Sequence, residues 1–461
     1  MQDLSRIFSK KKIAILGFGQ EGIDSYLALR RLLPNQVLAV ADQKTKKEFN
    51  VKARKIFAGD KKIKLHLGPK YLTRLGEYDL IIKTPGIPKR ALRRFLAVKA
   101  KVTSQTEIFF TYFSGLVIGV TGTKGKGTTA GLIYNILKSA GFKVKLVGNI
   151  GQPVFQLLLR TRLKPRASQK DNPVFVYELS SHQLQNLKHS PHIAVFTNLF
   201  PDHLEYYKNF QEYQKAKENI TIHQGLNDFF IYNSDDPRVN QIAKKTKAKR
   251  IPFGCKDAQA VLKIVSKKQI SLQGDFNLMN IAAAVKAAEI LGISKKFLQQ
   301  GIKTFKPLPH RLEFAGCYRG IDFYDDSMAT VPQTTQLDIG ALGPRLATII
   351  LGGSRKGDLD FSDLAKTIWQ SNIRTVILFP DTGQDIWQAI EKTRPNKKTA
   401  PPQMFPACSM PEAVDIAYQR TNKGEICLLA PASASFSLFL DYKQRGNLFK
   451  RYVKIFAKKT C

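Results

Sequence analysis

The sequence predicts an α/β protein with three domains: an N-terminal Rossmann-like domain, a central domain of the P-loop ATPase type and a C-terminal Rossmann-like domain. Two glycine-rich turns, each between an apolar strand-like run and a helical pattern, indicate the first two domains. Alternating strand and helix patterns continue toward the end of the chain and indicate the third. We place the domains at residues 1–113, 114–307 and 308–461.

The first domain opens with a strand-like run, residues 12–16, followed by the GxGxxG turn Gly17-Phe-Gly-Gln-Glu-Gly22. A second strand-like run, about twenty residues on, ends in an acidic residue. Backbone N–H groups in such a turn face a phosphate at a helix N-terminus, and a uridine diphosphate satisfies them as well as NAD does. The pattern predicts a phosphate site without fixing the ligand, formed by Gly17, Gly19, Gly22 and Asp42.

The central domain is organised around the loop Gly119-Val-Thr-Gly-Thr-Lys-Gly-Lys-Gly-Thr-Thr129, which follows an apolar run and precedes a helical pattern at residues 130–137. This is the setting of a phosphate-binding loop, in which a lysine reaches the β- and γ-phosphates. Gly127 stands where a hydroxyl normally holds Mg²⁺, and we take Thr128 as its substitute. The predicted nucleotide contacts are Gly122, Thr123, Lys124, Gly125, Lys126, Gly127 and Thr128.

Polar side chains follow the later strand-like runs of this domain. Glu178 ends the run Val174-Phe-Val-Tyr-Glu178, the place of a carboxylate that holds Mg²⁺ directly or through water. His203 follows Asp202 at the end of another run and could equally be an ordinary histidine. Lysines at 215 and 217 lie on a predicted helix, and from the pattern alone both would be solvated.

Composition limits the classes of function. With 43% hydrophobic residues and no apolar run of membrane-spanning length, the 461-residue chain is expected to be soluble. The net charge of +37 comes from dispersed lysines without interleaved aromatics, which favours attraction to anionic substrates over nucleic-acid binding. Five scattered cysteines without a CxxC pair, and no signal-peptide core at the start, indicate the cytoplasm. We expect a cytoplasmic monomer without nucleic-acid or membrane partners.

The unusual loop form Gly-Thr-x-Gly-Lys-x-Thr-Thr resembles that of the Mur ligase family, whose members make amide bonds at the expense of ATP. Further motifs in the same order extend the resemblance over nearly the whole chain. They are Thr84-Pro-Gly-Ile87, Gly148-Asn-Ile-Gly151, Glu178-Leu-Ser-Ser-His-Gln-Leu184, Leu308-Pro-His-Arg-Leu-Glu313, Asp326-Ser-Met-Ala-Thr330, Ala430-Pro-Ala-Ser-Ala-Ser435 and Asp441-Tyr-Lys-Gln-Arg-Gly446.

The resemblance implies a reaction as well as a fold. It is strongest to the family member that adds D-glutamate to UDP-N-acetylmuramoyl-L-alanine, with ATP and Mg²⁺, through an acyl phosphate formed as the domains close over the substrates. A ligase for another amino acid, a folylpolyglutamate-type ligase and an inactive nucleotide-binding homologue stay open as alternatives. Phe276 replaces a histidine of the family and Met328 a lysine, which removes whatever those side chains contribute.

Roles for individual residues also follow from the resemblance. The catalytic residues are Lys126, His203 and Lys217, with Lys217 carbamylated by CO₂ into an anionic group at the metal site. The metal ligands are Thr128, Glu178, His203 and Lys217. Additional ATP contacts are Asn277, Arg311 and Asp326. The remaining substrate contacts are Thr84, Pro85, Gly86, Asn149, Lys356, Ser435 and Tyr442.

Overall fold

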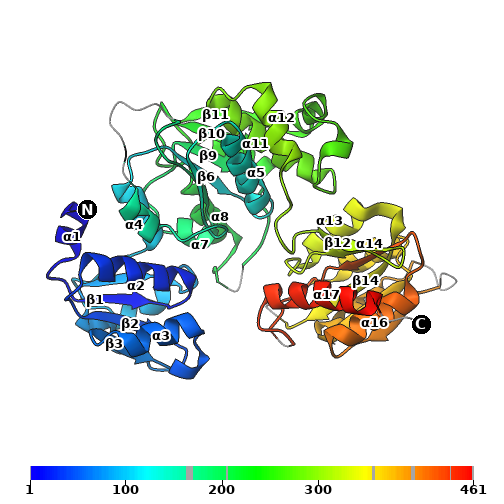
Figure 1. Ribbon diagram of the computed structural model, residues 1–461, viewed down its shortest axis with the longest axis horizontal. Helices are drawn as coiled ribbons and strands as arrows, with labels where there is room; N and C mark the ends of the chain where they lie inside the picture. The colour runs from blue at the N-terminus through cyan, green and yellow to red at the C-terminus, as the bar shows by residue number, and fades with distance from the viewer. Residues whose placement is uncertain are drawn as a thin grey trace. The chain divides into compact units, whose positions relative to one another are not determined.

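The computed structural model describes residues 2–161, 163, 170–203, 206–355, 359–395, 400–436 and 438–458 (Figure 1). These residues form three β-sheets and the helices that cover them, which confirms the predicted α/β class. Their contacts divide the chain into two compact units. The first unit holds residues 1–264 and 280–302, and the second holds residues 265–279 and 303–461. Within the described ranges, no helix is both long and apolar enough to cross a membrane.

The first sheet lies at the start of the first unit and has the strand order β3-β2-β1-β4-β5, with all neighbours parallel. Its central strands are apolar and almost fully buried, as expected for a parallel sheet covered on both faces. The strands are β1 Ile13–Leu16, β2 Leu38–Asp42, β3 Ile63–Leu67, β4 Leu80–Lys83 and β5 Lys101–Thr103. The helices are α1 Gln2–Phe8, α2 Gln20–Leu32, α3 Val51–Gly59 and α4 Gln105–Tyr112.

The second sheet has the parallel order β11-β10-β9-β6-β8-β7, with β6 between β9 and β8. Its strands are β6 Val117–Thr121, β7 Val144–Gly148, β8 Val174–Glu178, β9 Ile193–Phe196, β10 Phe229–Asn233 and β11 Lys249–Phe253. The helices with it are α5 Lys126–Ser139, α6 Phe155–Arg160, α7 Ser181–Leu184, α8 Phe210–Glu218, α9 Pro237–Ala243, α10 Cys255–Ala260, α11 Phe276–Ile290 and α12 Lys295–Lys303.

One hydrophobic core spans the first two sheets, and a buried carboxylate adds polar contacts between them. Asp24, on α2, accepts hydrogen bonds from Gln105 Nε2 at 2.7 Å, from the N–H of Phe155 at 2.9 Å and from Gln156 Nε2 at 2.8 Å. These contacts join α2, α4 and the start of α6. They explain why the first two sheets belong to one compact unit.

The third sheet has the order β12-β13-β17-β14-β15-β16, and β12 is antiparallel to its neighbour. Along β14, Ile349 and Leu351 pack on one face and Ile350 on the other, so each face has its own core. The strands are β12 Glu313–Tyr318, β13 Ile321–Asp325, β14 Leu346–Gly353, β15 Thr375–Asp381, β16 Gln403–Pro406 and β17 Ile426–Leu429. The helices are α13 Pro332–Leu342, α14 Ser362–Trp369, α15 Thr382–Lys392, α16 Met410–Arg420 and α17 Tyr442–Ala457 (Figure 1).

Each of the three predicted domain ranges contains one of these sheets, while contacts group the first two sheets into one unit. The boundaries at residues 113 and 307 stay a prediction.

Candidate functional site

The nucleotide loop joins β6 to α5 at the middle of the second sheet. Gly122 and Gly125 have φ angles of +150° and +82°, which a residue with a side chain rarely adopts. A Cβ atom at Gly122 would collide with the Thr197 hydroxyl, and one at Gly125 with Asn280 Oδ1. Gly125 is also the N-cap of α5, so the helix N-terminus opens directly into the loop. The glycines are therefore required by space as well as by backbone conformation.

Neighbouring residues hold the loop in shape from outside. Asn198 accepts the N–H of Thr123 on its carbonyl oxygen at 2.9 Å and the N–H of Lys124 on Oδ1 at 2.8 Å. The Thr197 hydroxyl donates to the Lys124 carbonyl at 2.6 Å, and Lys126 Nζ donates to the Thr123 carbonyl at 3.0 Å. A loop fixed in this way needs little rearrangement to receive an anion.

Glu178 lies at the carboxyl end of β8, where its strand pairs with β6 through Val120. Its side chain is 3% exposed, and its Oε2 atom has no hydrogen-bond partner among the described residues. Its Oε1 atom accepts a hydrogen bond of 3.4 Å from Asn149 Nδ2. A buried, unsatisfied carboxylate oxygen is a plausible ligand atom for a hard cation. Thr128, on the first turn of α5, is also buried, and its hydroxyl is another oxygen donor of the kind that Mg²⁺ prefers.

Lys217, on α8, is 1% exposed. Its Nζ donates to the Gly122 carbonyl at 2.6 Å and lies 3.4 Å from the Thr121 hydroxyl. Burial lowers the pKa of Lys217 well below its ordinary value, and the positive charge of Lys126 lowers it further. Lys217 is therefore a buried amine beside the nucleotide loop whose ammonium form is disfavoured, whereas Lys215 on the same helix is exposed. The pattern alone predicted two solvated lysines and was wrong for Lys217.

Asp202 and His203 follow β9. The Asp202 carboxylate lies 3.7 Å from Lys124 Nζ and 3.9 Å from His203 Nε2. Burial acts to raise the pKa of Asp202, but the charges of Lys124 and His203 outweigh it and hold the pKa below its ordinary value. His203 has a φ of +56°, a left-handed backbone conformation that costs energy and is enriched at functional sites.

A cavity of about 320 Å³ in the first unit brings several predicted site residues together. From the second sheet it is lined by Lys126, Asn149, His203 and Lys217. From the first sheet it is lined by Pro85, Gly86 and Glu21. The nucleotide-loop lysine, the buried amine and the turn that follows β4 thus line the same cavity.

The predicted phosphate turn lies at the switch point of the first sheet, where ligands bind in open α/β sheets. The Thr84 N–H and hydroxyl both donate to the Leu16 carbonyl, at 2.9 and 3.1 Å, so the turns after β1 and β4 are joined. Gly17 has a φ of +87°, and a Cβ there would collide with the Thr84 hydroxyl. Asp42 Oδ2 accepts the N–H of Phe18 in this turn at 2.7 Å, and its Oδ1 accepts the N–H of Lys44, just after β2, at 2.9 Å.

Glu21 was not singled out by the sequence, although it belongs to the GxGxxG turn. It lines the cavity and accepts a hydrogen bond of 2.8 Å from Gln183 Nε2. Burial raises the pKa of Glu21 to about 7. Asn280 was missed in the same way, and its Oδ1 accepts a 3.2 Å hydrogen bond from the Thr129 hydroxyl beside the nucleotide loop. No spacing rule in the sequence marked either residue.

The remaining predicted residues lie in the second unit. Asp326 is fully buried with Arg311 Nη1 3.9 Å from its Oδ1, and Asn277 Nδ2 donates to the Gln273 carbonyl at 2.6 Å. Their assignment to the nucleotide stays a prediction, as do the substrate roles of Ser435 and Tyr442. Lys356 lies outside the described residues.

The loop that carries Ser435 is fixed by a fully buried arginine. Arg445, on α17, donates to the carbonyl oxygens of Ser433 and Ala434, each at 3.2 Å. It also donates to the Ser327 hydroxyl at 3.0 Å, and that hydroxyl donates to the Tyr442 carbonyl at 2.8 Å. One side chain thus ties the segment after β13 to the segments that hold Ser435 and Tyr442.

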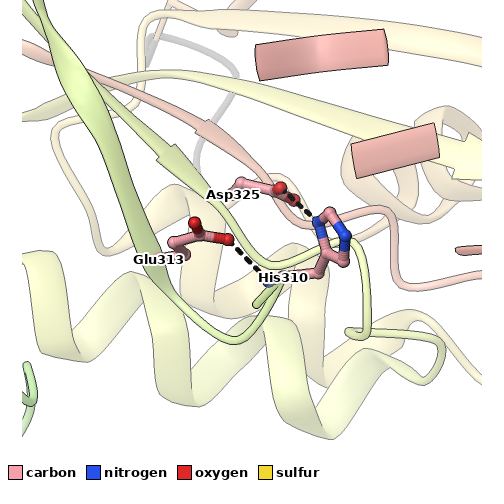
Figure 2. A group of neighbouring side chains, drawn as sticks. All are labelled: His310, Glu313 and Asp325. Carbon is pink, nitrogen blue, oxygen red and sulfur yellow. Dashed lines mark hydrogen bonds and ion pairs between the residues drawn. The ribbon is translucent and has the colours of Figure 1, made fainter. Parts of the chain in front are cut away.

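Figure 2 shows a further group of ionisable side chains in the second unit, His310, Glu313 and Asp325. His310 Nδ1 lies 2.7 Å from Asp325 Oδ2, and Glu313 Oε2 accepts the N–H of His310 at 2.8 Å. Glu313 also pairs with Lys450 of α17 at 2.8 Å. Because these groups already satisfy one another, we assign them the structural task of holding the turn that carries Arg311, and no metal.

Comparison with known proteins gives a consistent result. Residues 120–288 match the Mur ligase middle domain. The sequence is 32% identical to a UDP-N-acetylmuramoylalanine–D-glutamate ligase of Clostridium kluyveri and 30% identical to one of Acetivibrio thermocellus, each over 98% of both chains.

Among solved structures, the chain resembles the UDP-N-acetylmuramate–alanine ligase of Thermotoga maritima, with a TM-score of 0.59 and 17% identity. The match covers 97% of this chain and 99% of the ligase. It also resembles the MurF ligase of that organism in complex with ADP, with a TM-score of 0.56 and 17% identity, over 98% of this chain and 97% of the MurF chain. At these identities the structural likeness bears on the fold.

Proposed function

The chain belongs to the Mur ligase family, and we propose that it adds D-glutamate to UDP-N-acetylmuramoyl-L-alanine with conversion of ATP to ADP and phosphate. Full-length similarity to D-glutamate ligases supports the choice of substrates. The observation that carries the chemistry is the cavity in the first unit, because Lys126 and Lys217 line it together with Pro85 and Gly86.

The reaction must bring two anions together. The carboxylate of the alanyl group attacks the γ-phosphorus of ATP, a new carboxylate–phosphorus bond forms, and ADP leaves. The amine of D-glutamate then attacks the acyl carbon, and as the amide forms the nitrogen loses a proton and phosphate leaves. Lys126 and the N-terminus of α5 supply positive charge where the phosphoryl group transfers, so they offset the repulsion and stabilise the transition state.

Mg²⁺ would be held by Glu178 and Thr128, the oxygen donors on either side of the nucleotide loop. When bound, the ion supplies positive charge to the phosphate oxygens of ATP. The Oε2 atom of Glu178, buried without a hydrogen-bond partner among the described residues, supports this assignment. Asn149 donates to the other oxygen and keeps the carboxylate oriented.

We propose that Lys217 reacts with CO₂ to form a carbamate, with release of a proton. Only a neutral amine reacts with CO₂, and burial favours that form by lowering the pKa of Lys217. The charges of Lys126 and Lys124, which disfavour an ammonium at this position, favour an anion. His203 faces the same cavity and would share the site with the carbamate.

The rest of the assignment follows from the family. We propose that Gly17, Gly19, Gly22, Thr84, Pro85 and Gly86 receive the UDP-linked substrate, and that Ser435 and Tyr442 bind the amino acid. We also infer that the protein acts in the cytoplasm as a monomer on small molecules alone.

The experiment that tests this function is phosphate release by the purified protein with Mg-ATP and UDP-N-acetylmuramoyl-L-alanine. D-glutamate, L-glutamate, L-alanine and L-lysine are offered separately. We expect release with D-glutamate only. Release with another amino acid would move the enzyme to a different step, and ATP binding without release would show that the changes at Gly127, Phe276 and Met328 have abolished catalysis.

A further inference from the structure

Among the described residues, one carboxylate lines the cavity of about 320 Å³ that receives the anionic substrates. It belongs to Glu21, the second residue of α2 and part of the GxGxxG turn. The diphosphate of the UDP-linked substrate is assigned to the same turn, where the N-terminus of α2 favours an anion. An ionised Glu21 would repel a phosphate placed there. The protonation state of this side chain therefore bears on substrate binding.

The side-chain amide of Gln183 decides which oxygen of Glu21 is available to a ligand. Gln183 Oε1 accepts the N–H of Ser180 at 2.9 Å and the Ser180 hydroxyl at 3.1 Å. The Nε2 end of the amide therefore faces Glu21, and it donates to Glu21 Oε1 at 2.8 Å. Within the described residues, this is the one hydrogen bond of the Glu21 side chain. Its Oε2 atom is thus available to a group bound in the cavity.

Several groups around Glu21 act on its pKa. Burial raises the pKa to about 7; the Gln183 hydrogen bond and the charge of Lys83 oppose this rise, whereas the charge of Asp24 adds to it. Burial also raises the pKa of Tyr177 on β8, and the negative charge of Glu21 adds to that effect. The other ionisable residues that line the cavity are Lys126, His182, His203, Tyr213 and Lys217. Glu21 is thus about half protonated at neutral pH in the free protein.

A bound diphosphate would complete the protonation of Glu21. It places negative charge beside the carboxyl group, and a like charge nearby favours the neutral form. Because Oε1 accepts from Gln183, the proton belongs on Oε2. A neutral carboxyl group at this position donates a hydrogen bond to a phosphate oxygen, and hydrogen bonds to charged acceptors are the strong ones.

We propose that Glu21 is a substrate-binding residue, which as a neutral acid donates a hydrogen bond from Oε2 to the diphosphate of the UDP-linked substrate, so that the substrate binds together with a proton. The inference rests on the proposed function for the identity of this ligand. The proton comes from solvent and stays on Glu21 while the substrate is bound. Substrate affinity is therefore coupled to pH through one side chain.

The test is calorimetric titration of the full chain with UDP-N-acetylmuramoyl-L-alanine, without ATP, at pH 6.5 and pH 8.5. At pH 7.5 the titration is repeated in two buffers of different ionisation enthalpy, which gives the number of protons taken up on binding. The diphosphate of this ligand is a diester and its carboxylate is fully ionised, so the ligand itself does not titrate in this range.

We expect the wild type to bind about 25-fold more weakly at pH 8.5 than at pH 6.5, and to take up about three-quarters of a proton at pH 7.5, as follows from a pKa of about 7 in the free protein. In Glu21→Gln, an amide N–H replaces the Oε2 proton in a side chain of the same shape. This variant should bind at both pH values as the wild type does at pH 6.5, with the proton uptake lost.

The matched control is Glu107→Gln, which neutralises a carboxylate on the first turn of α4 that does not line this cavity. It should keep the pH profile and the proton uptake of the wild type. Because Glu21→Gln is expected to bind more tightly than the wild type at pH 8.5, a loss of folding cannot imitate the predicted result.

Three results would overturn the role of Glu21 and leave the proposed function standing. They are equal wild-type affinities at the two pH values, proton uptake that persists in Glu21→Gln, and weaker binding by Glu21→Gln at both pH values. The last result would mean that an ionised Glu21 accepts a hydrogen bond from the substrate. No binding to the wild type at either pH, together with no phosphate release, would instead contradict the proposed function and remove the ligand assigned to Glu21.

Discussion

Replacing Lys217 by Met tests whether the buried amine is catalytic or merely part of the core. Methionine fills nearly the same volume, so no cavity forms. The substitution removes the donor to the Gly122 carbonyl at 2.6 Å, and an unsatisfied carbonyl costs about 1–3 kcal/mol. Removal of a polar amine from a buried position offsets part of that cost. We therefore expect the free energy of unfolding to change by no more than about 2 kcal/mol.

Activity should respond far more strongly. If Lys217 supplies an anionic group to the reaction, its loss should lower kcat by about 100- to 1,000-fold, as for other groups that stabilise a transition state electrostatically. Phosphate release measures kcat, and denaturant unfolding measures stability. The matched control is Lys215→Met on the same helix, an exposed position that should leave both quantities unchanged.

Two results would refute this reasoning. A folded Lys217→Met protein with activity near that of the wild type would show that the amine is structural. Equal losses in both variants would show that helix α8 is merely sensitive to substitution. The carbamate itself is tested with ¹³C-labelled bicarbonate, which should give a carbamate carbon signal in the wild type and none in Lys217→Met.

Three further predictions concern the same unit. Gly125→Ala should lower the free energy of unfolding by about 1–3 kcal/mol and weaken ATP binding, because the new Cβ atom would collide with Asn280 at a φ of +82°. In the control Gly141→Ala, φ is +83° but the Cβ atom meets open space, so thermal unfolding should show a loss of only about 1–2 kcal/mol. Glu178→Gln keeps the volume but removes the charge, so the Mg²⁺ concentration for half-maximal phosphate release should rise about 10-fold or more, and an unchanged requirement would exclude it as a ligand. Burial raises the pKa of Glu21 from 4.5 to about 7, so the folded state becomes less stable as the carboxyl group ionises. The wild type should therefore lose up to ~3 kcal/mol of stability relative to Glu21→Gln as pH rises from about 4.5 through 7. Parallel profiles of unfolding free energy against pH for the two proteins would contradict this.

Much of the fold could be predicted because parallel strands buried on both faces appear as continuous apolar runs. The run that ends at Glu178 coincides with β8, and the glycine loop lies between β6 and α5 as expected. The edge strands were harder to predict from the sequence. β12 is only half-buried and β16 is largely exposed, so their residues lack the apolar pattern of a central strand.

The site was predictable where chemistry follows the ends of strands. The contact between Glu21 and Gln183 was not, because it joins residues 162 positions apart and depends on how the first sheet packs on the second. Asp42 shows a different limit, because a residue can be singled out from the sequence while its contacts in the fold stay unknown. Its place at the end of β2 predicted a substrate contact, which stays a prediction, and only coordinates reveal that its Oδ2 also accepts the Phe18 N–H and its Oδ1 the Lys44 N–H.

The central claim is that the UDP-linked carboxylate is activated as an acyl phosphate. It is tested most directly by labelling both oxygens of the alanyl carboxylate with ¹⁸O and analysing the phosphate released in the presence of Mg-ATP and D-glutamate. The account predicts that one labelled oxygen appears in the phosphate and the other in the new amide. Phosphate without label would mean that water attacks ATP, and would contradict the proposed reaction.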